Sequence, residues 1–352
     1  MHRLTRVIMA AAALALPVAS YAERFDATVV AGHPAVFRWV QMLDLAFIPE
    51  VNRALEGSGH SLDFMPQYGG AIAKVGDELE TIEFGLAELG LCFSLFDPAK
   101  LALQNVTYYT PFVTDDPSLV SEVMQQLHLS EPRMTEAYAE NGVVYLGAPI
   151  GIDDYLVMTN FPFTSMADLE GRKIAAPGSA VNWLSGTGAI GVSGNLTTYY
   201  NEMQTGVYDG VLVFASAALP GKLYEVAPYV TQLGLGAQFA GALCANVDWY
   251  ESLPEAVQNA LHSGADHAGD WYNRALEDAV AASLTGMADA GATVTEASAE
   301  LRSQWAMGMD NAAQNWAETL DAQGLPGSEI LSVYMNAMRD AGAVPLRQWD
   351  QE

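Results

Sequence analysis

Apolar residues along the chain alternate between two spacings, which predicts strands and helices in turn. A β-branched segment at residues 26–31 precedes a Gly-His-Pro turn, and apolar residues at helical spacing follow over residues 37–51. The same order returns with an apolar segment at 61–65, a turn at 66–70 and helical spacing over 75–84. This alternation, with short turns between the elements, predicts a mostly parallel sheet covered on both faces, and therefore an α/β fold.

The rest of the chain continues this pattern and adds one long helix. Residues 255–287 have apolar positions at helical spacing and contain no proline. A helix of roughly 30 residues reaches about 45 Å, more than one small domain, so it could connect two. Helical spacing also covers residues 197–205 and 298–341. Five more segments are predicted to be strands: residues 87–93, 142–146, 155–159, 173–176 and 210–214.

Composition narrows the class of protein. Hydrophobic residues make up 51% of the chain and charged residues 16%, which excludes a disordered protein. The 42 acidic and 15 basic residues give a net charge of −27, and this excludes nucleic acid as a partner, because binding a polyanion requires clustered Lys and Arg. A length of 352 residues predicts about two domains, and the lack of a Gly/Ser linker indicates that the chain crosses between them more than once.

The first 22 residues have the layout of a secretory signal peptide. Arg3 and Arg6 precede an apolar run over residues 7–19, and small residues stand at the −3 and −1 positions of a cleavage site after Ala22. The run is too short to cross a bilayer, which takes about 20 residues. We therefore predict a periplasmic protein without residues 1–22, in which 13 basic residues remain against 42 acidic ones.

The motifs typical of catalysis and cofactor binding are missing. Residues 186–191 match the GxGxxG pattern of dinucleotide-binding proteins, but the preceding predicted strand ends about ten residues too early, so we interpret them as a turn from a helix to a strand. Ser193 lacks a GxSxG nucleophile elbow, and the histidines form neither HExxH nor an i, i+4 pair that would hold zinc. The sequence thus predicts no catalytic residue, no metal site and no cofactor.

The two cysteines, Cys92 and Cys244, each lie at the end of an apolar segment. Exported proteins form disulfides, so the two could pair in the core. Two buried free thiols are the alternative.

Four segments resemble one family of transport receptors. Residues 159–174, with TN and then MADLEGRKI, are similar to the "TN…pxDLkGlKIR" segment of the DctP-type solute-binding proteins of TRAP transporters. Residues 199–210 (YYNEMQTGVYDG) resemble "vYtALqtGvvDG", and residues 222–230 (KLYEVAPYV) resemble "kfyEvakYv". Residues 248–261 (DWYESLPEAVQNAL) resemble "kwdsLPeevqkal". The four stand in the family's order and spacing, and the resemblance covers roughly residues 25–341.

The resemblance implies a two-lobed periplasmic-binding-protein fold, type II-like, in which each lobe has a mixed, mostly parallel sheet flanked by helices and a long helix bridges the lobes. We assign residues 23–148 and 237–290 to lobe I, and residues 149–236 and 291–352 to lobe II. Proteins of this family close over one solute and deliver it to a permease with a small and a large membrane subunit. We therefore expect a monomeric extracytoplasmic solute receptor whose ligand, by family default, is a small organic acid. A secreted hydrolase is the competing class.

The chain departs from the family where most members bind the substrate carboxylate. Those members have an arginine in the "KIR" strand, because a guanidinium pairs bidentately with a carboxylate, and this chain has Ala175 there. Hydrophobic residues also replace the polar ones usual after the DG pair at 209–210. An aromatic solute or a cationic amine is therefore an alternative, the amine held by aromatic rings and by Asp153 or Asp154. A third option keeps the acid and supplies the positive group from Arg38.

Ligand-binding residues are predicted at the carboxyl ends of strands, where open α/β sheets bind their ligands. Trp183 and Phe214 are the two strongest candidates, and Trp183→Ala is expected to weaken binding without unfolding the protein. The other candidates lie in strand-end turns of both lobes, at the lobe junction and on the first helix: Asn182, Tyr68, Phe93, Ser94, Asp154, Tyr155, Ser216, His33, Gln67 and Arg38.

Overall fold

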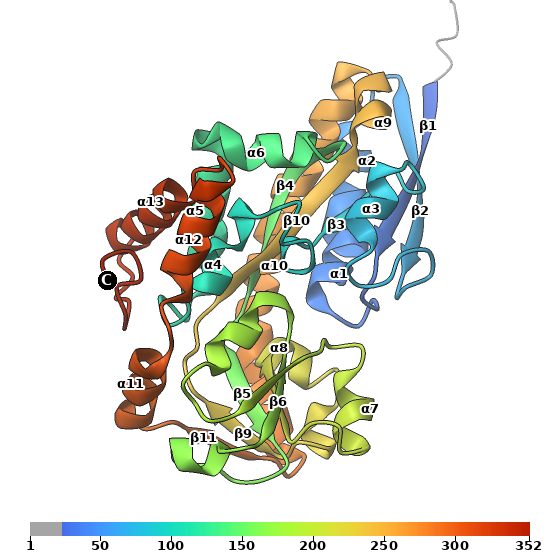
Figure 1. Cartoon of the computed structure of the whole chain (residues 1–352). Helices are drawn as coiled ribbons and strands as arrows, with labels where there is room; N and C mark the ends of the chain where they lie inside the picture. The colour runs from blue at the N-terminus through green and yellow to red at the C-terminus, as the bar shows by residue number, and fades with distance from the viewer. Residues whose placement is uncertain (1–22) are drawn as a thin grey trace, which may run out of the picture.

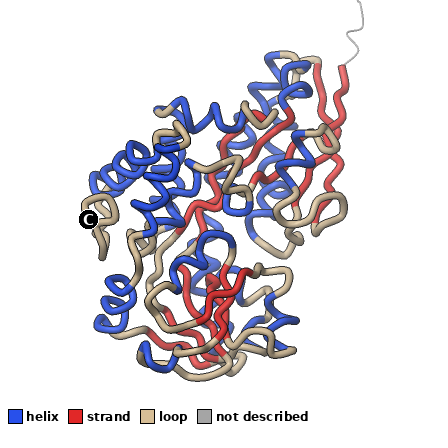
Figure 2. The backbone as a smooth tube through the Cα atoms, viewed as in Figure 1, coloured by secondary structure: helices blue, strands red, loops and turns tan. Residues whose placement is uncertain are grey.

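The computed structural model describes residues 23–352, which form two lobes around two separate sheets (Figure 1; Figure 2). The predicted signal peptide lies outside the described residues. Within residues 23–352, no helix has both the length and the apolar character of a membrane span. The two-lobed α/β architecture predicted from the sequence is confirmed.

Lobe I is built on a five-stranded mixed sheet in the order β2-β1-β3-β10-β4. Strand β1 pairs in parallel with β2 and β3, whereas β10 runs antiparallel to both β3 and β4. These strands are β1 (Glu23–Ala31), β2 (His60–Tyr68), β3 (Leu89–Cys92), β4 (Val143–Ile152) and β10 (Gln238–Asn246).

Lobe II is built on a six-stranded mixed sheet in the order β11-β9-β5-β8-β6-β7. Strand β5 runs antiparallel to both of its neighbours, and the other pairs are parallel. The strands are β5 (Tyr155–Thr159), β6 (Lys173–Ala176), β7 (Ile190–Ser193), β8 (Gly210–Phe214), β9 (Tyr229–Gln232) and β11 (Thr293–Glu296). The GxGxxG segment joins a 3-10 helix (Gly178–Leu184) to β7, as predicted.

Helices flank both sheets. The apolar spacing over residues 37–51 forms α1 (Arg38–Met42), a π-helical turn (Leu43–Phe47) and α2 (Ile48–Ala54) without a break. The other helices of lobe I are α3 (Glu78–Glu83), α4 (Val106–Tyr109), α5 (Pro117–Ser130), α6 (Pro132–Ala139) and α9 (Val247–Ser252). Those near lobe II are α7 (Tyr199–Gln204), α8 (Ala215–Ala218) and α11 (Ala299–Gly308).

The long helix α10 (Glu255–Asp289) bridges the lobes (Figure 1). It packs against β4, α1 and α2 in lobe I and against α8 and β11 in lobe II. Its buried face repeats every three or four positions, for example at Leu261, Ala265 and Ala268, as an amphipathic helix requires. The chain also crosses from β4 to β5 and from β9 to β10, and it returns to lobe I after α11, so the lobes are joined at four places.

The C-terminal helices return to lobe I. Helices α12 (Ala312–Ala322) and α13 (Gly327–Asp340) pack against each other, and both pack against α4; α13 also packs against α5 (Figure 1). This packing places α12 and α13 beside lobe I, whereas the ranges assigned from the sequence put them in lobe II. Those ranges stay a prediction.

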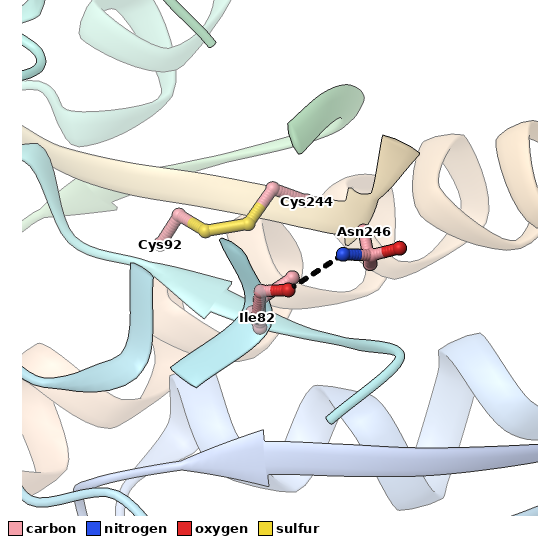
Figure 3. The surroundings of a disulfide bond; sticks show 4 residues. All are labelled: Ile82, Cys92, Cys244 and Asn246. Atoms are coloured by element: carbon pink, nitrogen blue, oxygen red, sulfur yellow. Dashed lines mark hydrogen bonds between the residues drawn. A yellow bond between two sulfur atoms is a disulfide. The ribbon is translucent and has the colours of Figure 1, made fainter. Parts of the chain in front are cut away.

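A disulfide joins Cys92 at the end of β3 to Cys244 in β10 (Figure 3). Their Cα atoms lie 5.9 Å apart, within the usual range for a disulfide. Both cysteines are buried in a small apolar cluster that includes Val30 and Leu79. Of the two alternatives left open by the sequence, the structure has the disulfide.

Strand β2 differs from the sequence prediction. A turn was expected at residues 66–70, but β2 continues through Pro66 to Tyr68, and Pro66 pairs in register with Val29. Proline removes a backbone donor, which a strand tolerates when it lies at the edge of a sheet, as β2 does.

Candidate functional site

A small cavity of about 30 Å³ lies where the two lobes meet. This volume is well below the roughly 300–1,000 Å³ of small-molecule sites, so a solute needs the lobes to move apart before it can enter. Residues from both lobes line it, and most of them are aromatic or aliphatic. They are His33, Trp39, Phe93, Leu95, Phe96, Tyr108, Ile152 and Ala240 of lobe I, and Tyr155, Pro177, Asn195, Leu196, Tyr199, Leu212, Val213 and Phe214 of lobe II.

No Asp, Glu, Lys or Arg is among these lining residues. His33 is buried, and burial lowers its pKa to about 4, so its ring is neutral at pH 7. Burial also raises the pKa of the Tyr108, Tyr155 and Tyr199 hydroxyls, which stay protonated. The wall of the cavity therefore carries no formal charge at neutral pH.

Aromatic rings of the two lobes meet across the cavity. The ring of Trp39 in α1 stacks on Phe37, with centroids 4.6 Å apart and planes 4° from parallel. The centroid of the Trp39 ring lies 5.7 Å from that of Phe214, which ends β8 in lobe II. Phe214 in turn contacts Tyr155 edge to face at 5.2 Å. Contacts of this kind add stability beyond the area that the rings bury, so the aromatic wall helps hold the lobes together.

Two nitrogen atoms of the lining residues are buried and have no hydrogen-bond partner in the described residues: His33 Nδ1 and Trp39 Nε1. Buried polar atoms in proteins are nearly always paired, so such atoms in the wall of a cavity call for a partner. The rings of His33 and Trp39 meet edge to face, with centroids 5.4 Å apart. Both atoms have almost no accessible surface in this arrangement of the lobes, so a ligand could reach them only after the lobes move apart.

Three other polar groups of the wall, two tyrosine hydroxyls and the Asn195 side-chain oxygen, form hydrogen bonds within the protein. The Tyr108 and Tyr155 hydroxyl oxygens lie 3.1 Å apart and share a hydrogen bond. The Asn195 side-chain oxygen accepts a hydrogen bond from the Thr197 backbone N–H at 2.9 Å.

Trp183 lies behind the two tyrosines and does not line the cavity. Its side chain is buried, it stacks on Tyr108 with centroids 5.7 Å apart, and its Nε1–H donates to the Tyr108 carbonyl at 2.7 Å. Its own carbonyl accepts a hydrogen bond from Trp305 Nε1 in α11 at 2.7 Å. Trp183 thus connects the 3-10 helix of lobe II with α4 of lobe I.

Two carboxylates occupy the β4-to-β5 crossing. Buried Asp153 accepts hydrogen bonds from the Ser216 hydroxyl at 2.5 Å and from the Ser216 backbone N–H at 3.1 Å. Asp154 accepts a hydrogen bond from the Gly236 backbone N–H at 2.7 Å, which ties this crossing to the one between β9 and β10. Burial raises the pKa of Asp153 to about 6 and that of Asp154 to about 7. Neither carboxylate lines the cavity.

A third buried carboxylate, Glu78, supports the loop that carries His33. It accepts hydrogen bonds from the backbone N–H groups of Gly32 at 2.9 Å and Gly76 at 2.6 Å. A Cβ atom at position 32 would collide with this carboxylate, so the close approach requires glycine. Burial raises the pKa of Glu78 to about 7.

The cavity brings together four residues proposed from the sequence: His33, Phe93, Tyr155 and Phe214. Ser94, Ser216 and Trp183 are buried next to it or behind it and bond to other protein groups. The remaining candidates lie elsewhere. Exposed Asn182 lines a separate surface hollow, Tyr68 donates to Asp44, Arg38 is exposed and donates to Gln41, and Gln67 lies in edge strand β2.

Sequence reasoning missed Trp39, Phe96, Tyr108 and Tyr199, which also line the cavity. Trp39 stands within the helical spacing over residues 37–51, from which only a helix was predicted. Tyr199 lies in a segment that was used to predict a helix and for the family resemblance, but not as a binding residue. Within residues 23–352, no group of three or more His, Cys, Asp or Glu side chains could hold a metal ion.

Comparison with known proteins gives the family. Residues 68–319 match the model of DctP, bacterial extracellular solute-binding protein, family 7. The ectoine-binding periplasmic protein TeaA of Halomonas elongata is 27% identical over 210 residues, which cover 57% of this chain and 59% of that protein.

Solved structures give the same fold. The Bordetella pertussis receptor DctP7, which binds pyroglutamic acid, has a TM-score of 0.77 at 17% identity and is similar over 88% of this chain and 99% of its own. A TRAP solute-binding protein of Rhodoferax ferrireducens, in complex with copurified benzoate, has a TM-score of 0.79 at 14% identity over 90% of this chain and 98% of its own. Because the family model matches well over half of the sequence, the chain belongs to the DctP family of bacterial extracellular solute-binding proteins.

Proposed function

We propose that this protein is the extracytoplasmic receptor of a TRAP transporter, which captures a small organic solute in the periplasm and delivers it unchanged to a membrane permease of a small and a large subunit. The observation that carries the proposal is the cavity between the lobes, which is lined by residues of both. The similarity to an ectoine-binding periplasmic protein and to TRAP solute-binding proteins supports it.

Capture requires that the lobes move relative to each other. The four connections are α10, the two strand crossings and the segment between α11 and α12. The short strand crossings suit hinge motion because they contain few residues. A solute that contacts Trp39 in lobe I and Phe214 in lobe II stabilises the form in which these residues are close together.

The lining bears on the choice between an organic acid and another solute. The family default is an acid held by arginine, but Ala175 is buried in β6 and Arg38 is exposed outside the cavity. A carboxylate in this cavity would have no basic side chain beside it. The aromatic lining favours the alternative, an aromatic solute or one with a cationic group.

Binding without turnover tests the proposal against the competing function, a secreted hydrolase. The purified protein is screened by thermal shift against acids, amines, zwitterions and polyols, and each compound that raises the melting temperature is incubated with it for hours. A receptor returns the compound unchanged, as mass spectrometry can verify. Chemical conversion of the bound compound, or no binding across the panel, would contradict a receptor function.

A further inference from the structure

We propose that Arg302 and Asp115 are positioning residues that control how readily the lobes part, because they form an ion pair only when the lobes have opened. An ion pair that exists only in the open form opposes closure over a solute and lowers the apparent affinity. Neither residue lines the cavity, so both act without touching the solute. The proposal rests on the lobe motion that the proposed function requires, but not on the identity of the solute.

A second, larger hollow of about 640 Å³ lies between the lobes, outside the cavity described above. On the side of lobe I, it is lined by the segment that leads into α5 and by the residues that follow α13. On the side of lobe II, it is lined by α11 and by the β9-to-β10 crossing. Helix α11 belongs to this side because Trp305 Nε1–H donates to the Trp183 carbonyl of lobe II.

The two strand crossings separate this hollow from the cavity. Ile152 and Tyr155, on either side of the β4-to-β5 crossing, line the cavity, whereas Gly234 of the β9-to-β10 crossing lines the hollow. The crossings are bonded to each other, since the Leu235 backbone N–H donates to the Tyr155 carbonyl at 3.3 Å. In Figure 1, α1 and α7 lie to the right of the crossings, and α11 and the C-terminal residues lie to the left. A rotation about the crossings that opens the cavity therefore narrows the hollow.

The hollow carries opposite charges on its two sides. Arg302 of α11 is the basic residue among those that line it, and Asp115 and Asp116 of lobe I are the acidic ones. The Asp116 carboxylate caps α5, because it accepts hydrogen bonds from the backbone N–H groups of Ser118 and Leu119. Arg302 and Asp115 are exposed, and within residues 23–352 neither side chain has a hydrogen bond or an ion pair in this arrangement of the lobes. They can pair when the hollow narrows.

The way α11 is held suits this motion. The Arg302 guanidinium lies against the β9-to-β10 crossing, where a Cβ atom at Gly234 would collide with it. At the other end of α11, buried Arg347 donates through Nη1 to the Ala306 and Met309 carbonyls at 2.8 and 2.7 Å. Arg347 follows α13, which packs beside lobe I. The C-terminal end of α11 is thus tied to lobe I, and the half that carries Arg302 can swing toward Asp115.

Pulsed electron paramagnetic resonance measures the open and closed populations of the protein after dialysis to remove any bound solute. Spin labels are attached at Ile72→Cys in lobe I and Asn201→Cys in lobe II, with the native disulfide kept oxidised. Both positions are exposed. Residue 72 follows β2 at the sheet edge that carries His33, and residue 201 follows Tyr199 of the cavity wall. The distance between the labels therefore grows when the cavity opens.

Arg302→Gln and Asp115→Asn should each lower the ratio of open to closed molecules by about two- to fivefold, the usual strength of an exposed ion pair. The two variants change the net charge in opposite directions, so a shift of both toward the closed form is not an effect of overall charge. Exchange of the two charges, Arg302→Asp with Asp115→Arg, should restore the ratio. The matched control is Arg274→Gln, which removes the same charge from an exposed side chain of α10 outside the hollow and should leave the ratio unchanged.

An unchanged ratio in the two single variants, a shift of either toward the open form, or no recovery on charge exchange would overturn the ion pair. Each of these results leaves the receptor function standing, because the lobes still move. One short label distance in the unmodified protein and in every variant would show that the lobes do not part, and it would count against both proposals.

Discussion

Replacement of Trp183 by alanine should remove a large part of the protein's free energy of unfolding, and not only weaken ligand binding. The side chain is buried and packs between Tyr108, which it stacks on, and Tyr155, which it meets edge to face at 5.1 Å. Truncating a buried tryptophan to alanine costs about 3–5 kcal/mol through lost burial and the cavity left behind. The Tyr108 carbonyl also loses the Nε1–H donor at 2.7 Å, and an unsatisfied buried acceptor adds about 1–3 kcal/mol.

Together these effects amount to about 5 kcal/mol, which is comparable to the whole stability of a marginal protein. From the sequence, we expected Trp183→Ala to leave the fold intact. From the structure, we expect this variant to be strongly destabilised. Guanidinium unfolding followed by circular dichroism measures the loss, with the disulfide kept oxidised. Trp183→Phe is the control: it keeps most of the ring contacts and should lose only about 1–3 kcal/mol for the missing donor. A loss below about 2 kcal/mol in Trp183→Ala would refute the packing argument.

Three further predictions concern stability. Replacing Cys92 and Cys244 by alanine removes a disulfide that closes a loop of sequence separation 152, and the chain-entropy model gives a loss of stability of about 5 kcal/mol at most. We expect denaturant titration to show a loss of about 3–5 kcal/mol. A loss under about 1 kcal/mol would show that the disulfide hardly constrains the unfolded chain. Burial raises the folded-state pKa values of Asp153 to about 6 and of Asp154 and Glu78 to about 7. Protonation of these groups therefore favours the folded state, and the melting temperature should rise as the pH falls from 8 to 5. A melting temperature that falls steadily over that interval would contradict this prediction. Asp154→Asn keeps an oxygen acceptor for its backbone donor and removes the charge, so stability at pH 8 should be unchanged or higher by about 1 kcal/mol, with a flatter pH profile; a clear loss at pH 8 would mean that the charge itself holds the crossing together.

Much of the sheet structure could be predicted from hydrophobic pattern. The predicted strands at residues 155–159, 173–176 and 210–214 coincide with β5, β6 and β8 of lobe II. These strands are buried almost throughout, so their apolar runs are unbroken and short turns delimit them. The long helix was also expected over 255–287, and α10 extends from Glu255 to Asp289.

Pairing between distant strands could not be predicted. Strand β10 inserts between β3 and β4 after the chain has passed through lobe II, and nothing local in its sequence specifies those neighbours. The long extent of β4 was missed as well, because its second half, from Gly147 to Ile152, contains glycine and proline and has register shifts opposite β10.

Only some of the residues that line the cavity could be predicted from the sequence. His33, Phe93 and Phe214 were found because each stands at the end of a strand. Trp39 was missed because it lies in a helix, where its spacing is that of an ordinary core residue. Its role as a lining residue depends on the position of lobe II, which only the three-dimensional structure gives.

The disulfide between Cys92 and Cys244 closes residues 92–244 into a covalent ring. This ring contains most of the chain that forms lobe II, including strands β5 to β9 and both strand crossings. A protease that cuts one exposed loop inside this ring opens it but produces two pieces that stay linked through sulfur. A molecule cut once would thus keep its two halves together, and the cut would become visible only on a gel run under reducing conditions.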